Sequence, residues 1–200
     1  GFLGMGMPTG NEECVNLLYT DYATTYDIVD KEGINALLKE VAKEEPDITI
    51  ALVHWGSENN KSVSATQESI VSLMKKAGVD VILGSHPHLL QTIVHGSLAG
   101  TLGAYSLGDF FGEADRGATN YSGILDIEIT KDYETGVTRV TDWNYVPIYT
   151  LSETECDGDR RVIRIENAIE AYEMNFVDKV TAACYDNLKF SLERIGARII

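Results

Sequence analysis

The chain has 200 residues, of which 44% are hydrophobic, and it carries 31 acidic against 16 basic side chains, for a formal net charge of −15 at pH 7. This composition allows one domain of ordinary size with a buried core. The acidic balance argues against a nucleic-acid-binding protein, because phosphate contacts need clustered Lys and Arg. The net charge also gives no help in steering a polyanionic substrate, so any anion site has to be local.

The cysteines and the N-terminus give two further indications. Three cysteines lie far apart and form no CxxC pair, which favours ordinary thiols over a disulfide framework or a metal cluster; they are Cys14, Cys156 and Cys184. No run reaches the roughly 18 apolar residues that a membrane helix needs. The Gly-rich start, GFLGMGMPTG, lacks a basic region and is interpreted as an internal start rather than a signal peptide.

The first half of the chain alternates between helical and strand patterns. Asp30 is suited to cap a helix whose apolar positions recur at helical spacing before Pro46. Those positions are Ile34, Leu37, Leu38 and Val41. The run 48–53 (ITIALV) predicts a strand covered on both faces. Thr66 is predicted to cap a second helix, and the run 79–83 (VDVIL) predicts another buried strand. This alternation of helices and strands predicts a layered α/β fold.

The second half is predicted to be more antiparallel. Residues 92–95 and 104–107 are typical of short strands around a Gly-rich turn, and residues 124–129 alternate apolar and polar side chains. The segment KDYETG predicts a turn into a further strand over 137–149. Beyond it, apolar periodicity predicts a helical tail over about 161–195.

Three of the four histidines follow two predicted strands: His54 in VHWGSE, and His86 and His88 in GSHPH. Strand ends are where open α/β sheets place ligands. In an extended segment, side chains at i and i+2 project to one side, so the H-x-H imidazoles can reach one metal or two adjacent metals. Pro87 is expected to bias His86 toward an extended conformation, and Gly84 to allow a tight turn. Imidazole suits zinc, iron and similar metals, but histidines in such a pattern also occur in purely structural roles.

The aromatic residues near these motifs are interpreted as packing groups rather than as stacking platforms for a substrate. Trp55 and Tyr105 are expected in the core or in a pocket wall. Phe110 and Phe111 are expected to pack, and His95 is expected at the surface.

The elements HWGSE, Gln67, AGVDVILGSHPHLLQ and YSLGDFF follow one another within residues 30–111. This ordered set resembles the CapA family of poly-γ-glutamate capsule-synthesis proteins, in its C-terminal portion only. The resemblance implies a calcineurin-like metallophosphoesterase fold, which is a layered α/β sandwich with a mixed sheet. Residues 1–150 would form the C-terminal part of that domain, and residues 151–200 its C-terminal helical extension.

By the same resemblance, His54, His86 and His88 are the expected catalytic and metal-binding residues of a dinuclear centre. His54 and His86 would ligate one metal and His88 the other, and the expected metals are divalent Mn, Fe or Zn. In related hydrolases such metals hold phosphoryl oxygens and polarise a hydroxide. The residues expected to bind substrate or to orient ligands are Glu58, Gln91, Ser106 and Asp109. The family usually has Asn at the position of Asp109, so a carboxylate is added here, which could touch a metal or cap a turn.

The superfamily's first motifs, which supply two aspartates and an Asn-His pair, are not found in this sequence, so we expect little catalysis by these residues alone. Three functions stay open: a CapA-type protein of capsule biosynthesis or export, a metal-dependent phosphoesterase or other hydrolase, and a catalytically inactive binding domain. The resemblance implies an anionic polymer (poly-γ-glutamate) or a phosphoester as substrate and capsule-synthesis membrane proteins as partners. It also implies an extracellular or cell-surface location, membrane-associated through a segment outside this chain. Half of a sandwich would expose a sheet edge and an apolar face, so self-association is expected.

Overall fold

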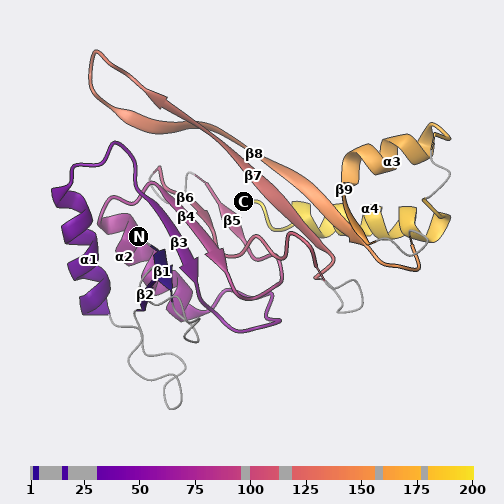
Figure 1. Ribbon diagram of the computed structural model, residues 1–200, viewed down its shortest axis with the longest axis horizontal. Coiled ribbons are helices and arrows are strands. Elements are labelled where there is room, and N and C mark those ends of the chain that lie inside the picture. Colours follow the sequence, from indigo (N-terminus) through magenta and orange to yellow (C-terminus); the bar gives the residue numbers. More distant parts are fainter. Residues whose placement is uncertain are drawn as a thin grey trace.

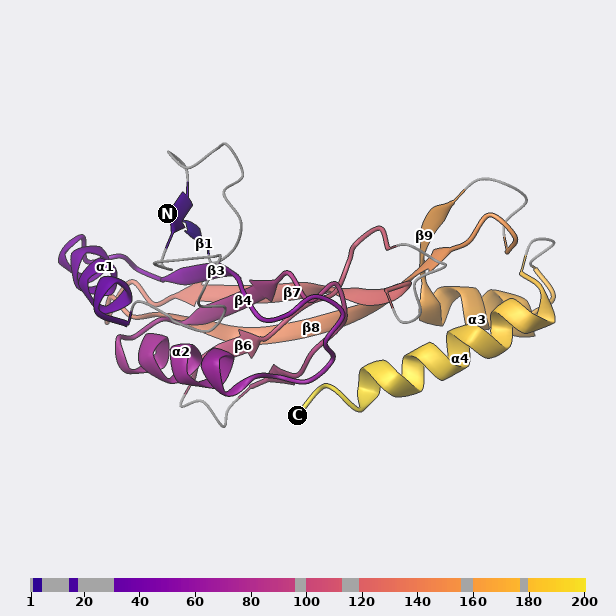
Figure 2. The ribbon, with the colours of Figure 1, turned by 90° about the horizontal axis from the view of Figure 1, so that it is seen from below.

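The computed structural model describes residues 2–4, 15–17, 31–95, 100–112, 119–155, 160–176 and 180–200. The strands in this part of the chain are β1 (Phe2–Gly4), β2 (Val15–Leu17), β3 (Ile50–His54), β4 (Val81–Ser85), β5 (Ile93–Val94), β6 (Leu102–Ala104), β7 (Tyr121–Lys131), β8 (Thr138–Leu151) and β9 (Arg161–Arg164). The helices are α1 (Lys31–Lys43), α2 (Ala65–Lys76), α3 (Ile165–Glu173) and α4 (Ala182–Gly196). Helices α1 and α2 lie at one end of the molecule and α3 and α4 at the other, with the long β7–β8 hairpin running between the two ends (Figure 1 and, turned by 90°, Figure 2).

The strands form a mixed sheet and an antiparallel sheet. The mixed sheet has the order β2-β1-β3-β4-β6-β5, in which all neighbours pair in parallel except β5, which is antiparallel to β6. The second sheet has the order β7-β8-β9 and is antiparallel throughout. The predicted α/β class with a mixed sheet is therefore confirmed, as is the more antiparallel character of the second half.

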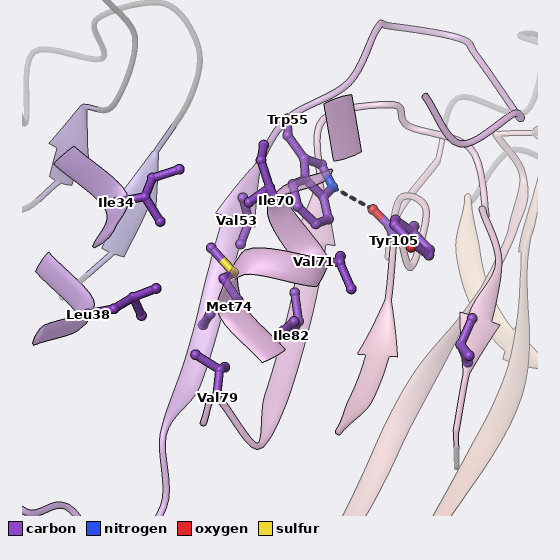
Figure 3. Close-up of a cluster of buried hydrophobic side chains, with 12 residues drawn as sticks. Ile34, Leu38, Val53, Trp55, Ile70, Val71, Met74, Val79, Ile82 and Tyr105 are labelled. Carbon is purple, nitrogen blue, oxygen red and sulfur yellow. Dashed lines mark hydrogen bonds between the residues drawn. The ribbon is translucent and has the colours of Figure 1, made fainter. Parts of the chain in front are cut away.

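Helices α1 and α2 bury apolar stripes against one face of the mixed sheet (Figure 3). Ile34 and Leu38 of α1 and Ile70 and Met74 of α2 belong to one cluster with Val53 of β3. Burial of each such side chain contributes about 1.5–3 kcal/mol. The first helix is thus confirmed, although its predicted cap, at residue 30, lies outside the described residues.

The predicted cap of α2 was wrong, because Ser64 and not Thr66 caps this helix. The Ser64 hydroxyl accepts a hydrogen bond from the backbone N–H of Gln67 at 3.2 Å. In return, the Gln67 side-chain oxygen accepts from the Ser64 backbone N–H at 3.0 Å. This reciprocal pair is a capping box, and it satisfies two amide donors that the first helical turn leaves unpaired.

Strand β3 was predicted to be covered on both faces, and this was wrong. Ala51 and Val53 are buried under the helices, but Ile50 and Leu52, which point to the opposite face, are 43% and 40% exposed. The antiparallel sheet covers that opposite face mainly over β4 and β6, where apolar side chains of both strands join the second core cluster. An apolar strip on β3 is therefore partly open to solvent, while the self-association expected from such a surface stays a prediction.

The second core cluster also anchors the C-terminal helices. Ile165 of α3 and Cys184 and Leu188 of α4 are buried together with Tyr149 of β8. The predicted helical tail is confirmed for α3 and α4 but wrong at its start, since residues 161–164 pair with the end of β8 as β9. Four residues are enough to add a strand to an exposed edge, and such a short run carries little periodic signal.

Two smaller expectations concern the thiols and the membrane. Cys184 is a buried thiol, as predicted, whereas Cys14 and Cys156 lie outside the described residues. In the part of the chain that the structure describes, no helix combines the length and the apolar character that crossing a membrane requires.

Candidate functional site

The three motif histidines lie at one edge of the mixed sheet. Strands β3, β4 and β6 are adjacent and parallel, so their carboxyl ends meet at the same edge. His54 ends β3 and pairs in register with Ser85, the last residue of β4. His86 and His88 follow β4 directly, and Asp109 lies in the segment after β6. We call His54, His86, His88 and Asp109 the histidine edge.

The backbone of the H-x-H pair is not extended, so that expectation was wrong. His86 has φ of 96° and His88 has φ of 60°, both in the left-handed region. A side chain in this region costs roughly 1–2 kcal/mol per residue. The carbonyl of Pro87 accepts a hydrogen bond from the backbone N–H of Asn59 at 3.0 Å, which ties the turn to the loop after β3. In this backbone conformation the two histidines have different closest partners, His54 for His86 and Asp109 for His88.

His86 lies against His54. Their ring centroids are 4.5 Å apart, with the planes inclined by 49°. Although His54 is exposed and His86 half-buried, partial desolvation lowers the pKa of both imidazoles; the neighbouring histidines lower the pKa of His54 further, whereas Glu58 opposes the shift at His86. The lowered pKa values favour the neutral form of both rings at pH 7, in which one ring nitrogen has a lone pair that can accept a proton or bind a cation.

His88 is held by carboxylates on both sides. Its Nδ1 lies 2.8 Å and 3.1 Å from the two carboxylate oxygens of Asp109, and its Nε2 lies 3.8 Å from Oε1 of Glu58. With Nδ1–H donating to Asp109, the tautomer is fixed and Nε2 is the atom presented to the loop that carries Glu58. The Asp109 backbone N–H also donates to the His88 carbonyl at 3.3 Å, and its own carbonyl accepts from the Ser122 hydroxyl at 2.6 Å. The carboxylate at position 109 thus contacts a histidine of the motif.

Gln91 lies beneath this edge and is fully buried. Its side-chain Nε2 donates to the backbone carbonyls of Asn60 and Ser62 at 2.9 Å and 3.0 Å, and its Oε1 accepts from Nε2 of Gln67 at 2.8 Å. Gln91 therefore supports the loop that carries Glu58 from below. The sequence interpretation gave Gln67 no role of its own; the Ser-x-x-Gln spacing at positions 64–67 was the signal that could have found its capping role.

Ser106 is also buried and takes part in the turn after β6. Its hydroxyl accepts from the backbone N–H of Gly108 at 3.3 Å, and its carbonyl accepts from the backbone N–H of Gln91 at 3.0 Å. The structure thus brings Glu58 and Asp109 to the histidines, whereas Gln91 and Ser106 support the loops around them.

The aromatic residues divide into two groups. Trp55 and Tyr105 are buried, as predicted. Phe110 and Phe111 are 63% and 54% exposed, so the packing role expected for them was wrong. The guanidinium carbon of Arg160 lies 5.2 Å from the centroid of Phe111, a cation–π contact beside the turn that carries Asp109. His95, as expected, is exposed.

Gly84 serves close packing and not the tight turn expected for it. The indole N–H of Trp55 donates to the Tyr105 carbonyl at 2.7 Å across β4 (Figure 3). A Cβ on Gly84 would lie 2.0 Å from that carbonyl oxygen and 2.4 Å from the indole nitrogen. Only a residue without a side chain leaves room for the hydrogen bond that joins the ends of β3 and β6.

The described residues supply only some of the ligands that a metal site needs. Among the residues that the structure describes, no group of three or more His, Cys, Asp or Glu side chains is placed to hold one ion. His54 and His86 form the closest imidazole pair, while the rings of His86 and His88 are 6.4 Å apart. Two neutral imidazoles have the chemistry that transition metals prefer, but they do not complete a metal site in this arrangement.

Comparison with known proteins establishes the family. A model of the family described as "Bacterial capsule synthesis protein PGA_cap" matches residues 7–114, more than half of the chain. The chain belongs to this family. The resemblance inferred from the motifs is therefore confirmed, and the histidine edge lies within the matched residues of this PGA_cap chain.

Curated relatives carry related descriptions. The chain is 34% identical over 91 residues to the PGA biosynthesis protein CapA of Bacillus subtilis (strain 168), a match over 46% of this chain and 23% of that protein. It is 38% identical over 64 residues to the capsule biosynthesis protein CapA of Bacillus anthracis, over 29% of this chain and 16% of that protein. These matches therefore span a quarter or less of the length of the relatives. A crystal structure of a phosphatase from Mycoplasma pneumoniae is similar with a TM-score of 0.38 and 13% identity, over 57% of this chain and 46% of that one.

Proposed function

We propose that this chain is part of a CapA-type protein of capsule biosynthesis that acts on poly-γ-glutamate during its export, anchoring or processing. The observation that carries the proposal is membership of the PGA_cap family through a stretch that contains the whole histidine edge. The convergence of His54, His86, His88 and Asp109 at one sheet edge supports a chemical or binding role for that edge, since open α/β sheets place ligands there.

In this proposal, His54 and His86 together hold a divalent transition metal, Mn, Fe or Zn, within a metallophosphoesterase-like centre. Their neutral state at pH 7 and their ring separation of 4.5 Å support it, and the remaining donors come from outside the described residues. His88 presents Nε2 as a further donor because Asp109 holds its Nδ1. A bound metal would supply Lewis-acid activation of an oxygen ligand.

Elemental analysis tests the metal. The full-length parent protein is expected to carry transition metal in stoichiometric amount, and its His54→Ala/His86→Ala/His88→Ala variant to lose it. The matched control is His95→Ala, which removes the fourth histidine outside the edge and should retain the metal. A full-length protein without metal after purification in metal-supplemented buffer, or a triple variant that keeps the metal, would refute this half of the proposal.

Capsule production tests the biological role. In the full-length parent protein, His86→Ala is expected to abolish capsular poly-γ-glutamate, whereas His95→Ala leaves it unchanged. We also propose a cell-surface location and an association with capsule-synthesis membrane proteins, which cell fractionation of the full-length parent protein tests. Normal capsule from cells that contain a correctly folded His86→Ala protein would contradict the proposal.

A further inference from the structure

A cavity of about 600 Å³ lies between α1 and α2, on the helical layer rather than on the histidine edge. Lys31 and Lys39 of α1 and Lys76 of α2 line it, and no Asp or Glu is among its lining residues. We call it the lysine groove. In a chain with almost twice as many acidic as basic side chains, such a lining is a marked local reversal of charge.

The three lysines are not explained by interactions within the protein. Within the described ranges, none of them forms an ion pair, whereas Lys43 of the same helix α1 pairs with Glu40 at 2.6 Å. Lys31 stands in the first turn of α1, where the helix dipole disfavours a cation. Like charges gathered in one groove repel one another weakly when they are exposed, and a bound anion would relieve that repulsion.

The spacing of the charges indicates an extended ligand. Lys31 and Lys39 are eight residues apart on one helix, which separates them by about 12 Å along its axis. A single carboxylate or phosphate contacts both ammonium groups only if the two side chains bend toward each other, whereas a chain with repeated anionic groups can contact them without such bending. Asn35, Ser69 and Ser72 also line the groove and offer neutral hydrogen-bond donors between the charges.

The floor of the groove suits the uncharged part of such a chain. Leu38 and Leu73 contribute apolar surface to the lining. A polymer that carries acidic groups on short aliphatic linkers, joined by amides, would place its methylenes on this floor and its carboxylates beside the ammonium groups. Ammonium groups are compact, hydrated point charges, so each contact is weak and affinity comes from their number.

We propose that the lysine groove binds a segment of a linear polycarboxylate through Lys31, Lys39 and Lys76. The choice of carboxylate as the anion rests on the proposed function, whereas the charge and the length of the site come from the groove itself. The polymer is thus held on the helical layer, at a place separate from the histidine edge.

Isothermal titration calorimetry with short poly-γ-glutamate at low ionic strength tests the proposal. The Lys31→Gln/Lys39→Gln/Lys76→Gln variant is expected to bind about ten-fold more weakly or worse, because three charge contacts are lost. The control is Lys43→Gln/Lys75→Gln/Lys189→Gln, which changes the net charge equally outside the groove and should bind like the natural chain. Added salt should weaken binding to the natural chain, since it screens exposed charges. Circular dichroism checks that both variants are folded.

The other outcomes separate this proposal from the proposed function. Equal losses in the two lysine variants would assign binding to overall charge, and an unchanged groove variant would remove the groove from it; either result overturns the proposal. The His54→Ala/His86→Ala variant is expected to bind the polymer normally. Loss of binding in that variant alone would refute the groove as the binding site and would leave the proposed function standing.

The nature of the anion is tested separately. Tighter binding of polyphosphate than of poly-γ-glutamate at equal charge would refute a polycarboxylate as the ligand of the groove. If the groove binds the polymer but the protein has no effect on capsule production, the groove is supported as a binding site and the proposed function is refuted.

Discussion

The histidine edge lies at one edge of the mixed sheet and the lysine groove on the helices that cover this sheet, and the two depend on different kinds of support. At the histidine edge, the side chains depend on buried groups beneath them: Gln91 holds the loop, and Gly84 leaves room for the Trp55 hydrogen bond. In the groove, the lysines stand on exposed helical surface without ion-pair partners among the described residues. A site whose side chains must be placed accurately needs support from the buried core. A site that binds through charge needs only several side chains of the same charge close to one another.

The largest effect expected from this contrast comes from Gly84→Ala. The added methyl group would overlap the Tyr105 carbonyl and the Trp55 indole, so the variant is expected to lose about 3 kcal/mol of unfolding free energy. Urea unfolding followed by circular dichroism measures this loss.

Gly196→Ala is the matched control for that substitution. Gly196 lies at the end of α4, and a Cβ there would meet no atom within 4 Å. The control is expected to be neutral or stabilising by up to about 1 kcal/mol, because alanine is the better helix former. Equal unfolding midpoints for the two variants would show that the edge does not depend on close packing at Gly84.

A smaller loss is expected from Gln91→Leu. The substitution leaves the Asn60 and Ser62 carbonyls without their buried donor, at a cost of about 2 kcal/mol. Hydrogen exchange should also become faster for the amides of the loop over 57–62, which measures local opening. A double-mutant cycle with Gln67→Leu isolates the link between the two glutamines. Unchanged exchange in this loop would mean that Gln91 is not its support.

A still smaller effect is expected at Asp109, where the contact is partly exposed. Asp109→Ala should change the free energy of unfolding by less than about 1 kcal/mol. It should also allow His88 to carry its proton on either ring nitrogen, a change that ¹⁵N NMR of the imidazole detects. Asp109→Asn should restore the natural tautomer, since its side-chain oxygen can still accept from Nδ1–H. The same ¹⁵N signals in the natural chain and in Asp109→Ala would exclude Asp109 as the group that orients His88.

The smallest effect is a dependence of stability on pH in metal-free protein. The pKa values of His54 and His86 are lowered in the folded state, so the unfolded chain takes up protons first as the pH falls. The stability is therefore full above the unfolded value of 6.5 and is lost as the pH falls through the folded pKa values. Urea midpoints on both sides of pH 6.5 should show this slope, and His54→Asn/His86→Asn should flatten it, unlike His95→Asn. An equal slope in both variants would argue against lowered pKa values of these two rings in the folded state.

The sequence allowed the strand-end placement of the histidines to be predicted, because a buried run followed by His is a local pattern. It did not allow the φ angles of His86 and His88 to be predicted, since these depend on the contact between Pro87 and Asn59, far away in the chain. The half-covered face of β3 was missed for the same reason, because the sequence of a strand does not tell which neighbour covers it. The groove could not be predicted at all, because Lys31 and Lys76 come together only when the helices pack.

Trp55 gives the histidine edge a spectroscopic reporter of its own. The chain has two tryptophans, and the other, Trp143, is half-buried in the hairpin. In a Trp143→Phe background, fluorescence would come from an indole that adjoins His54 in the chain and is hydrogen-bonded to Tyr105, ahead of the turn that carries Asp109. A paramagnetic metal bound at the edge would quench that emission, whereas a polymer without a quenching group, bound between the helices, would not quench it. The same hydrogen bond that fixes the strand ends thus allows occupancy of the two sites to be distinguished by light.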